Sequence, residues 1–230
     1  MRVVALNIKH GGGSRLNQLL DRLKKYQADV IVLTEYRNNL NSELIKKSLK
    51  NSAYIYQFTS AISDSNSVLI ASKKSSKQLS LSNIENDDKH RVCLIQVGSI
   101  KIMGVYFAQK IKKKSLFDYI NNEGSNLLAD KGLIIGDFNT GIIYLDEKDD
   151  SFFCSKEFQD LEANGFIDAW RSRNPNKSEF SWYSDAGNGF RIDHAFCTIP
   201  LNKLVSHIQY DHEPRLKLET DHSALIIDFK

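Results

Sequence analysis

The stretch Leu133-Ile134-Ile135-Gly136-Asp137-Phe138-Asn139-Thr140-Gly141 joins an apolar run to a group of polar residues. Its three consecutive branched apolar residues leave no solvated face, so it predicts a buried strand that stops abruptly at polar residues. Asp137 and Asn139 are two positions apart, and in extended backbone both side chains leave on the same side. The stretch therefore indicates a carboxylate beside an amide at the rim of a core. A simple Asx turn after a strand is the alternative, because Asp and Asn favour such turns.

Two other apolar runs end in the same way. Residues 3–6 precede Asn7, and residues 29–34 precede Glu35, so each run predicts a buried strand with a polar side chain at its end. Glu35 could also be only the first solvated residue after a core strand. Read together with Asp137, the repeated pattern favours a shared rim where several strands end.

The remaining pattern predicts four helices and a series of strands. Ser14 is expected to cap a first helix that carries an apolar stripe from Leu16 to Tyr26. Further helices are expected at residues 42–51, at 116–128 with a possible break at Gly124, and at 155–164 with Gly165 after the last turn. Strands are expected at 54–59, 67–71, 92–97, 100–107, 180–183, 191–196, 205–210 and 224–229.

The order of these elements decides the fold class. From residue 54 to residue 107 strand follows strand without a helix between, which indicates mixed or antiparallel sheets and not a doubly wound parallel sheet. We expect an α+β fold: a four-layered α/β/β/α sandwich of two packed mixed sheets with helices on the outer faces. The 230 residues show no composition break or internal repeat, so residues 1–230 are expected to form a single domain.

Composition narrows the class of protein. Three widely spaced cysteines argue against a disulfide framework and against a thiolate zinc site. The N-terminus does not read as a signal peptide, and no run of 18 apolar residues occurs, so a cytoplasmic protein without a membrane segment is expected. The net charge of +3 and the lysines at 73–77 and 110–114 permit a polyanionic partner, although such runs are often only solvated faces. No obligate protein partner is inferred.

The polar residues at the strand ends form a set rich in oxygen ligands. Such a set suits Mg²⁺ or Mn²⁺ and suits zinc poorly. Hydrolysis of phosphate esters is the natural chemistry, since it needs a metal ion, a carboxylate to activate water and fixed donors for the developing charge. The set comprises Asn7, Glu35, Tyr106, Asp137, Asn139, Asp193, Asp221 and His222.

In this order the sequence resembles the endonuclease/exonuclease/phosphatase superfamily, and most of all exonuclease III and the related AP endonucleases. The matching pieces span almost the whole chain, and their order is more specific than any one of them. They are residues 6–8, 29–35, 104–107, 135–139, 165–168, 180–182, 191–193 and 220–223.

The resemblance implies a role for each matching residue. Glu35 would bind the metal ion with Asn7 beside it, and Asp221 would either assist the ion or only position its neighbour. Asp137 would orient or deprotonate the attacking water, while Asn139 and Tyr106 would hold the phosphate. His222 would face the oxyanion and be held by Asp193.

Asp193 and His194 are adjacent, so in a strand they point to opposite faces and only one can reach the site. We assign Asp193 to the site and His194 to packing or to the surface. Trp182, Phe190 and Ile192 match positions that line a sugar pocket in AP endonucleases, and Arg191 is placed in the same substrate-binding group. Trp182 and Phe190 could equally be ordinary core aromatics.

Several positions depart from the pattern. Lys9 stands where AP endonucleases carry Asp or Asn, which argues against a second cation there. His10 and three glycines replace the usual Gly-Leu-Arg, Thr220 replaces the commoner Ser, and the segment from Trp182 to Phe190 is short.

We therefore predict a Mg²⁺-dependent or Mn²⁺-dependent nuclease that acts on nucleic acid, with DNA as the first candidate. The alternatives are a phosphatase or phosphodiesterase for RNA or a smaller phosphoester, and a nucleic-acid-binding module without catalysis. Residues 191–194 lack the signature of inositol phosphatases, and every catalytic position holds a chemically competent residue.

Overall fold

The first of two six-stranded sheets is built around the N-terminal strand. In this computed structural model, which describes residues 1–230, the strand order is β13-β14-β1-β2-β4-β3. β1 and β2 are parallel and the other neighbours are antiparallel. The strands are β1 (Arg2–Asn7), β2 (Val30–Tyr36), β3 (Tyr56–Thr59), β4 (Ser67–Ser72), β13 (Val205–Asp211) and β14 (Ala224–Phe229).

The second sheet contains the apolar run before Asp137 as one of its central strands. Its order is β5-β6-β7-β8-β12-β9, with β7 and β8 parallel and the other neighbours antiparallel. A separate hairpin pairs β10 (Trp182–Tyr183) with β11 (Gly189–Phe190). The strands of the sheet are β5 (Ser76–Gln78), β6 (Val92–Val97), β7 (Ile100–Tyr106), β8 (Gly132–Asp137), β9 (Phe166–Asp168) and β12 (Asp193–Thr198).

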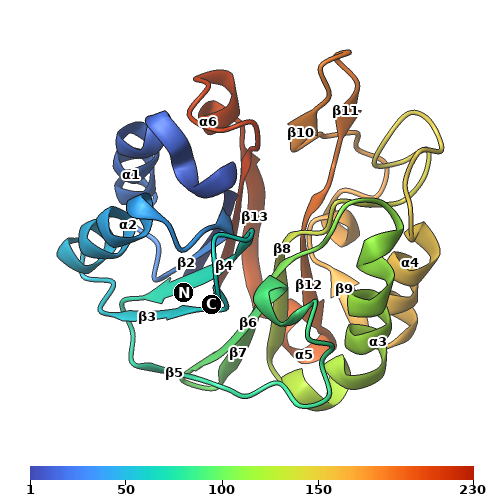
Figure 1. Cartoon of the computed structure of the whole chain (residues 1–230). Coiled ribbons are helices and arrows are strands. Elements are labelled where there is room, and N and C mark those ends of the chain that lie inside the picture. The colour runs from blue at the N-terminus through green and yellow to red at the C-terminus, as the bar shows by residue number, and fades with distance from the viewer.

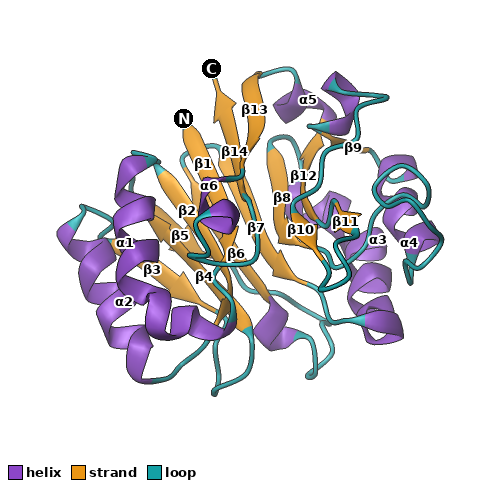
Figure 2. Ribbon diagram, turned by 90° about the horizontal axis from the view of Figure 1, so that it is seen from above, coloured by secondary structure: helices purple, strands orange, loops and turns teal.

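Helices cover the outer face of each sheet (Figures 1 and 2). α1 (Leu16–Lys25) and α2 (Leu40–Asn51) lie on the first sheet, and α3 (Lys114–Leu128) and α4 (Ser155–Ala163) lie on the second. No helix is both long enough and apolar enough to cross a membrane. The short helices are α5 (Ile199–Asn202), α6 (Glu213–Leu216), η1 (His10–Arg15), η2 (Lys89–Arg91), η3 (Lys110–Lys113) and η4 (Arg171–Arg173).

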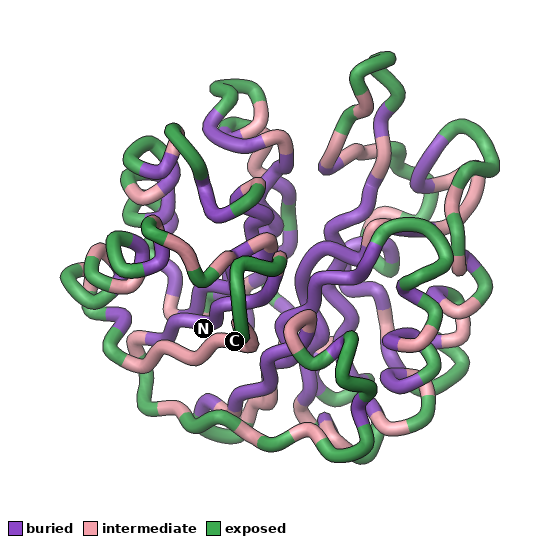
Figure 3. The backbone as a smooth tube through the Cα atoms, in the orientation of Figure 1, coloured by how far each residue is buried: buried purple, intermediate pink, exposed green.

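Three apolar clusters hold the layers together. The largest, of 24 buried residues, lies between the sheets and includes Val32, Val68 and Ile135. Clusters of 18 and 17 buried residues lie beneath the two pairs of helices. Figure 3 shows the resulting buried strands inside exposed connections. The predicted four-layered α/β/β/α sandwich of two mixed sheets is therefore confirmed.

Two local predictions were wrong. Ser14 does not cap α1, because the chain first makes the 3₁₀ turn η1 and the helix begins at Leu16 without a side-chain cap. Gly124 does not break α3, which runs through it. Gly124 is buried within α3, and a Cβ there would meet the Phe166 ring of β9 at 3.4 Å, an ordinary packing contact.

Candidate active site

A hollow of about 460 Å³ opens at the edge of the sandwich where the predicted strand ends meet. The strand register explains the meeting, since Tyr106 pairs with Asp137 and Asp137 pairs with Asp193 across three neighbouring strands. Eight of the twelve predicted site residues line the hollow: Glu35, Asp137, Asn139, Trp182, Phe190, Ile192, Asp221 and His222.

Glu35 reaches the hollow through a β-bulge. The pairing of β2 with β4 jumps from Thr34 to Tyr36, which leaves Glu35 outside the ladder with φ of 52°. One carboxylate oxygen accepts a 2.9 Å bond from the backbone N–H of His10, and the other accepts from Asn7. Glu35 is therefore an irregularity within β2 and not the simple end of a strand.

Asn7 lies beneath the hollow and joins two carboxylates. Its Nδ2 donates to Glu35 Oε1 at 3.1 Å and to Asp137 Oδ2 at 2.9 Å. Its amide oxygen accepts the backbone N–H of Lys9 at 2.8 Å. Both carboxylates need donors, so this orientation of the amide is fixed, and it turns the amide oxygen away from Glu35. Asn7 thus orients the carboxylates, and its part in metal binding stays a prediction.

Asp137 is buried at the centre of the site. Gly136 before it has φ of 146°, and a Cβ there would lie 2.1 Å from the Val105 carbonyl oxygen, so β8 needs glycine at this point. Burial raises the pKa of Asp137 to about 7; His222 opposes this shift, whereas Asp193 and Glu35 add to it. A carboxylate with a pKa near neutrality is suited to accept a proton.

Hydrogen bonds from both the backbone and the side chain of Asn139 fix its position. Its backbone N–H donates to Asp137 Oδ1 at 2.9 Å, and its φ is 51°, so the extended geometry ends at Asp137. Its Nδ2 donates to the Phe107 carbonyl oxygen at 2.8 Å. Asp137 and Asn139 therefore form an Asx turn, and both also line the hollow.

His222 and Asp193 form a buried pair. His222 Nδ1 lies 2.8 Å from Asp193 Oδ2, which leaves Nε2 free to face the hollow. Burial disfavours the imidazolium, but the Asp193 carboxylate outweighs this and the pKa of His222 is raised to about 10. His222 is therefore a fixed cationic donor at neutral pH. His194 is fully buried among Phe138, Phe158 and Phe196, so it has the packing role assigned to it.

Asp221 and Tyr106 contribute less directly. The Asp221 carboxylate pairs with Lys9 Nζ at 2.9 Å, which neutralises it and leaves its part in metal binding a prediction. Tyr106 is 6% exposed, and its hydroxyl accepts from Asn66 Nδ2 at 3.1 Å. Burial, with Glu35 and Asp137 nearby, raises the pKa of Tyr106, so the hydroxyl stays protonated.

An aromatic wall bounds one side of the hollow. The rings of Trp182 and Phe190, on the hairpin β10–β11, lie 5.6 Å apart, and Phe152 lies 5.7 Å from Phe190. Trp182 and Phe190 are partly exposed in the hollow and belong to none of the three core clusters. The pocket interpretation of these aromatics therefore fits the structure better than the core interpretation.

The placement of Arg191 in the substrate-binding group is wrong. Its side chain is fully buried and points into the protein. Its guanidinium bonds the Asp146 carboxylate at 2.6 and 3.0 Å and the Asp168 carboxylate at 2.8 Å. Arg191 and its neighbour Ile192 point to opposite sides of the chain, so only Ile192 reaches the hollow.

Seven residues of the hollow were not among the predicted site residues: Lys9 and His10, noted only as departures from the family pattern, and five residues from two loops. Gln109 and Lys110 come from the connection after β7, and Ser151, Phe152 and Phe153 come from the long loop after β8. The sequence feature that could have pointed to the loop after β8 is the pair of adjacent aromatics, Phe152 and Phe153, after the acidic run 146–150. Loops without periodicity give no other indication of where they fold back.

The donor set fits a hard divalent cation held at Glu35. Its carboxylate faces the hollow, and the Asp137 carboxylate beside it is destabilised by neighbouring negative charge that a cation would relieve. No group of three or more His, Cys, Asp or Glu side chains has metal-binding geometry. Water and substrate oxygens would have to complete the shell, as is usual for Mg²⁺ and unusual for zinc.

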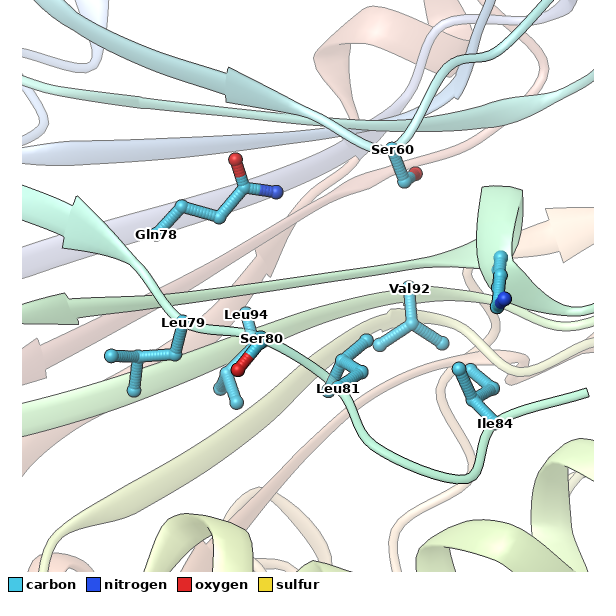
Figure 4. A pocket seen from close by; sticks show the side chains of 9 residues that line it. Ser60, Gln78, Leu79, Ser80, Leu81, Ile84, Val92 and Leu94 are labelled. Atoms are coloured by element: carbon cyan, nitrogen blue, oxygen red, sulfur yellow. The ribbon is translucent and has the colours of Figure 1, made fainter.

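A different hollow of about 410 Å³ lies beside β6 and has no such chemistry (Figure 4). Its lining is mostly aliphatic, with Leu79, Leu81 and Ile84 from the loop after β5, and it contains neither a carboxylate nor a histidine. The candidate active site is therefore the hollow around Asp137.

Comparisons with known proteins identify the fold and the family of the chain. The chain is similar to the 3′ phosphatase NExo from Neisseria bound to product DNA hairpin (TM-score 0.85, 20% identity, 100% of this chain and 99% of that chain). It is also similar to an AP endonuclease from Archaeoglobus fulgidus (TM-score 0.84, 20% identity, 100% of this chain and 99% of that chain). A third similar structure is the 3′-5′ exonuclease NExo from Neisseria meningitidis (TM-score 0.84, 21% identity, 100% of both chains). The TM-scores over the full length of the chains establish the shared fold. The model of the endonuclease/exonuclease/phosphatase family matches residues 4–222, almost the whole chain, and the protein therefore belongs to that family.

Proposed function

We propose that the protein is a Mg²⁺-dependent phosphodiesterase that cleaves nucleic acid, with DNA as the substrate. The observation that carries the proposal is that Asp137, whose pKa is raised to about 7, and His222, held by Asp193, line the same hollow. A proton acceptor and a cationic donor on either side of a reacting phosphate are what hydrolysis by water requires.

The chain's own residues divide the work. Asp137, oriented by Asn7, takes the proton of the attacking water. His222, held protonated by Asp193, donates through Nε2 to a phosphate oxygen as negative charge develops, and Asn139 fixes the position of Asp137. A Mg²⁺ ion at Glu35 would neutralise phosphoryl oxygens.

Charge favours a polyanion over a small ester. Lys9 and Lys110 line the hollow from the connections after β1 and β7. Lys9 is paired with Asp221, whereas Lys110 makes no ion pair and offers its charge to a substrate. A strand passing over the hollow would meet both. A nucleic-acid substrate is also consistent with the DNA-processing names of the similar structures.

The test is cleavage of supercoiled plasmid and of 3′-labelled and 5′-labelled oligonucleotides, with Mg²⁺ and with EDTA. We expect cleavage in Mg²⁺ and none in EDTA. Activity should fall by about 10²-fold or more in Asp137→Asn and in His222→Ala. The surface control Lys203→Gln, on the opposite edge of the molecule, should keep normal activity. Binding without cleavage would show a silent module, and cleavage only of phosphomonoesters would show a phosphatase; either result would contradict the proposal.

A further inference from the structure

A second hollow, of about 540 Å³, lies directly beside the catalytic hollow. The Lys9–Asp221 ion pair lines both, so it forms the ridge between them. The second hollow is bounded by η1, by α6 with the loop after it, and by the β10–β11 hairpin, which stand at the same edge of the sandwich (Figure 1). A chain bound at the catalytic hollow would therefore continue into it.

Two arginines that line this second hollow have guanidinium N–H groups without a hydrogen-bond acceptor. Arg15 makes no ion pair or hydrogen bond, and its Nε is buried without a partner. A buried guanidinium donor without an acceptor is costly, so its retention calls for an anion. Arg215 bonds only the Ser223 hydroxyl, at 3.3 Å, and has no carboxylate partner. The hollow thus holds cationic charge that the protein itself does not neutralise.

An aromatic platform stands next to these charges. The Arg215 guanidinium lies 4.4 Å from the centre of the Tyr183 ring, and this contact bridges α6 and β10. Tyr183 is 40% exposed, and Leu216 and Leu218 beside it are 68% and 77% exposed. Exposed planar and apolar groups beside unpaired arginines suit a nucleobase attached to a phosphate.

We propose that this hollow, bounded by Arg15, Tyr183, Arg215, Leu216 and Leu218, binds the nucleotide that adjoins the reacting phosphate, with its base unpaired. Arg15 and Arg215 hold its phosphate, and the base stacks on the Tyr183–Arg215 platform. A paired base has both faces covered by the duplex stack, so the site favours single strands and frayed ends. This inference rests on the proposed function, because it assumes that a nucleic-acid strand occupies the catalytic hollow.

Binding in EDTA tests the site without turnover. Fluorescence anisotropy would follow a short labelled single strand with the wild type, Arg15→Gln, Tyr183→Leu, Tyr183→Phe and the control Lys203→Gln. Removal of a stacking ring weakens binding by about 5-fold or more, so we expect that loss in Tyr183→Leu and recovery in Tyr183→Phe. Arg15→Gln should lower the salt dependence by one phosphate contact, a slope change of about 0.7.

The base itself supplies the sharper test. A strand with an abasic residue at the position that adjoins the reacting phosphate should bind wild type and Tyr183→Leu equally, because the ring then has nothing to stack on. Melting temperatures close to that of the wild type would show that each variant folds. Equal affinities of wild type, Arg15→Gln and Tyr183→Leu for the intact strand would overturn the inference.

The two proposals fail in different ways. If bis(p-nitrophenyl) phosphate and oligonucleotides are hydrolysed but the binding differences are missing, the nucleotide site is wrong and the phosphodiesterase remains. If the binding differences appear but no ester is hydrolysed, the nucleotide site stands and the catalytic proposal fails.

Discussion

At the residue scale, the site depends on side chains whose backbone is irregular. Glu35 occupies a bulge with φ of 52°, and Asn139 has φ of 51°. Such conformations are disfavoured for side-chain-bearing residues and persist only where the surroundings fix them. Here the fixed elements are β2, β4 and the Asx turn after β8, which aim an acid and an amide at one space.

Glu35→Gln should weaken Mn²⁺ binding, followed by electron paramagnetic resonance, and abolish metal-stimulated cleavage. The amide keeps the shape of the side chain and removes the charge that attracts the ion. Circular dichroism should show an unchanged fold. Wild-type metal affinity in this variant would contradict the placement of the ion at Glu35.

His222→Ala should lower kcat by about 10²-fold or more, the usual cost of a deleted donor to a developing oxyanion. Asp193→Ala should cost a similar amount, because Asp193 holds the imidazole and its charge. The double variant should lose little more than either single variant, since the two act as one unit. Multiplicative losses in single-turnover rates would show that the residues act independently.

The pH profile of kcat should be bell-shaped. Asp137 must lose its proton to act as base, so activity rises with pH up to about 7, and bound Mg²⁺ would move this limb to lower pH. His222 must keep its proton, so activity falls above about 10. Asp193→Asn should bring the descending limb to lower pH, because the carboxylate that holds the proton is lost. If the descending limb does not move in this variant, a group other than His222 sets it.

At the scale of elements, the loops after β8 and around the hairpin complete the site. A buried ion network fastens the first of them: Asp146 bonds Arg191 and lies in an ion pair with Arg171 at 2.5 Å. Asp168 joins the network through Arg191, which holds its pKa well below the usual range against the effect of burial. The loop that carries Phe152 is thus tied to the start of β12.

Arg191→Met should lower the free energy of unfolding by about 3–5 kcal/mol, because it leaves the buried Asp168 carboxylate without its arginine partner. Denaturant unfolding would measure this, with the exposed Lys203→Gln as control. The difference in the free energy of unfolding between wild type and variant should become smaller as the pH falls towards 4, because protonation removes the unpaired charge from Asp168 in the variant. A deficit that is constant from pH 7 to pH 4 would mean lost packing and not an unpaired charge.

Trp182→Ala tests the aromatic wall as a sugar pocket. Turning a nucleotide out of a duplex costs least where the base is missing, so a tight aromatic pocket would select abasic sites. We expect the variant to lose more activity on abasic duplex than on undamaged DNA, with little change in melting temperature. If the wild type shows no preference for abasic sites, or if both substrates lose equally as the protein unfolds, the pocket role is wrong.

At the scale of the whole molecule, the fold brings together what the chain keeps apart. Asn7 and Asp137, 130 positions apart, are joined by a 2.9 Å hydrogen bond because β1 and β8 come from facing sheets. Asp193 and His222 likewise come from β12 of one sheet and the segment before β14 of the other. The interface between the sheets therefore sets the catalytic geometry as well as the stability.

The sequence by itself determined the layers and most of the strand ends. Apolar periodicity and buried runs are local properties, so β6 and β14 are found with the predicted bounds and the sandwich follows from the order of elements. The same logic pointed to Glu35 and Asp137, because a polar residue after a buried strand must emerge at a rim. The three strands that were missed, β5, β9 and β11, are only two or three residues long and carry no period.

Only the tertiary structure decided how the polar residues divide between the site and the interior. Arg191 and Ile192 are neighbours in sequence, yet one is buried against Asp146 and the other lines the hollow. Asn7 points its amide nitrogen at two carboxylates, and Lys9 neutralises Asp221. Each outcome depends on charges brought close by long-range pairing, which composition and spacing along the chain do not contain.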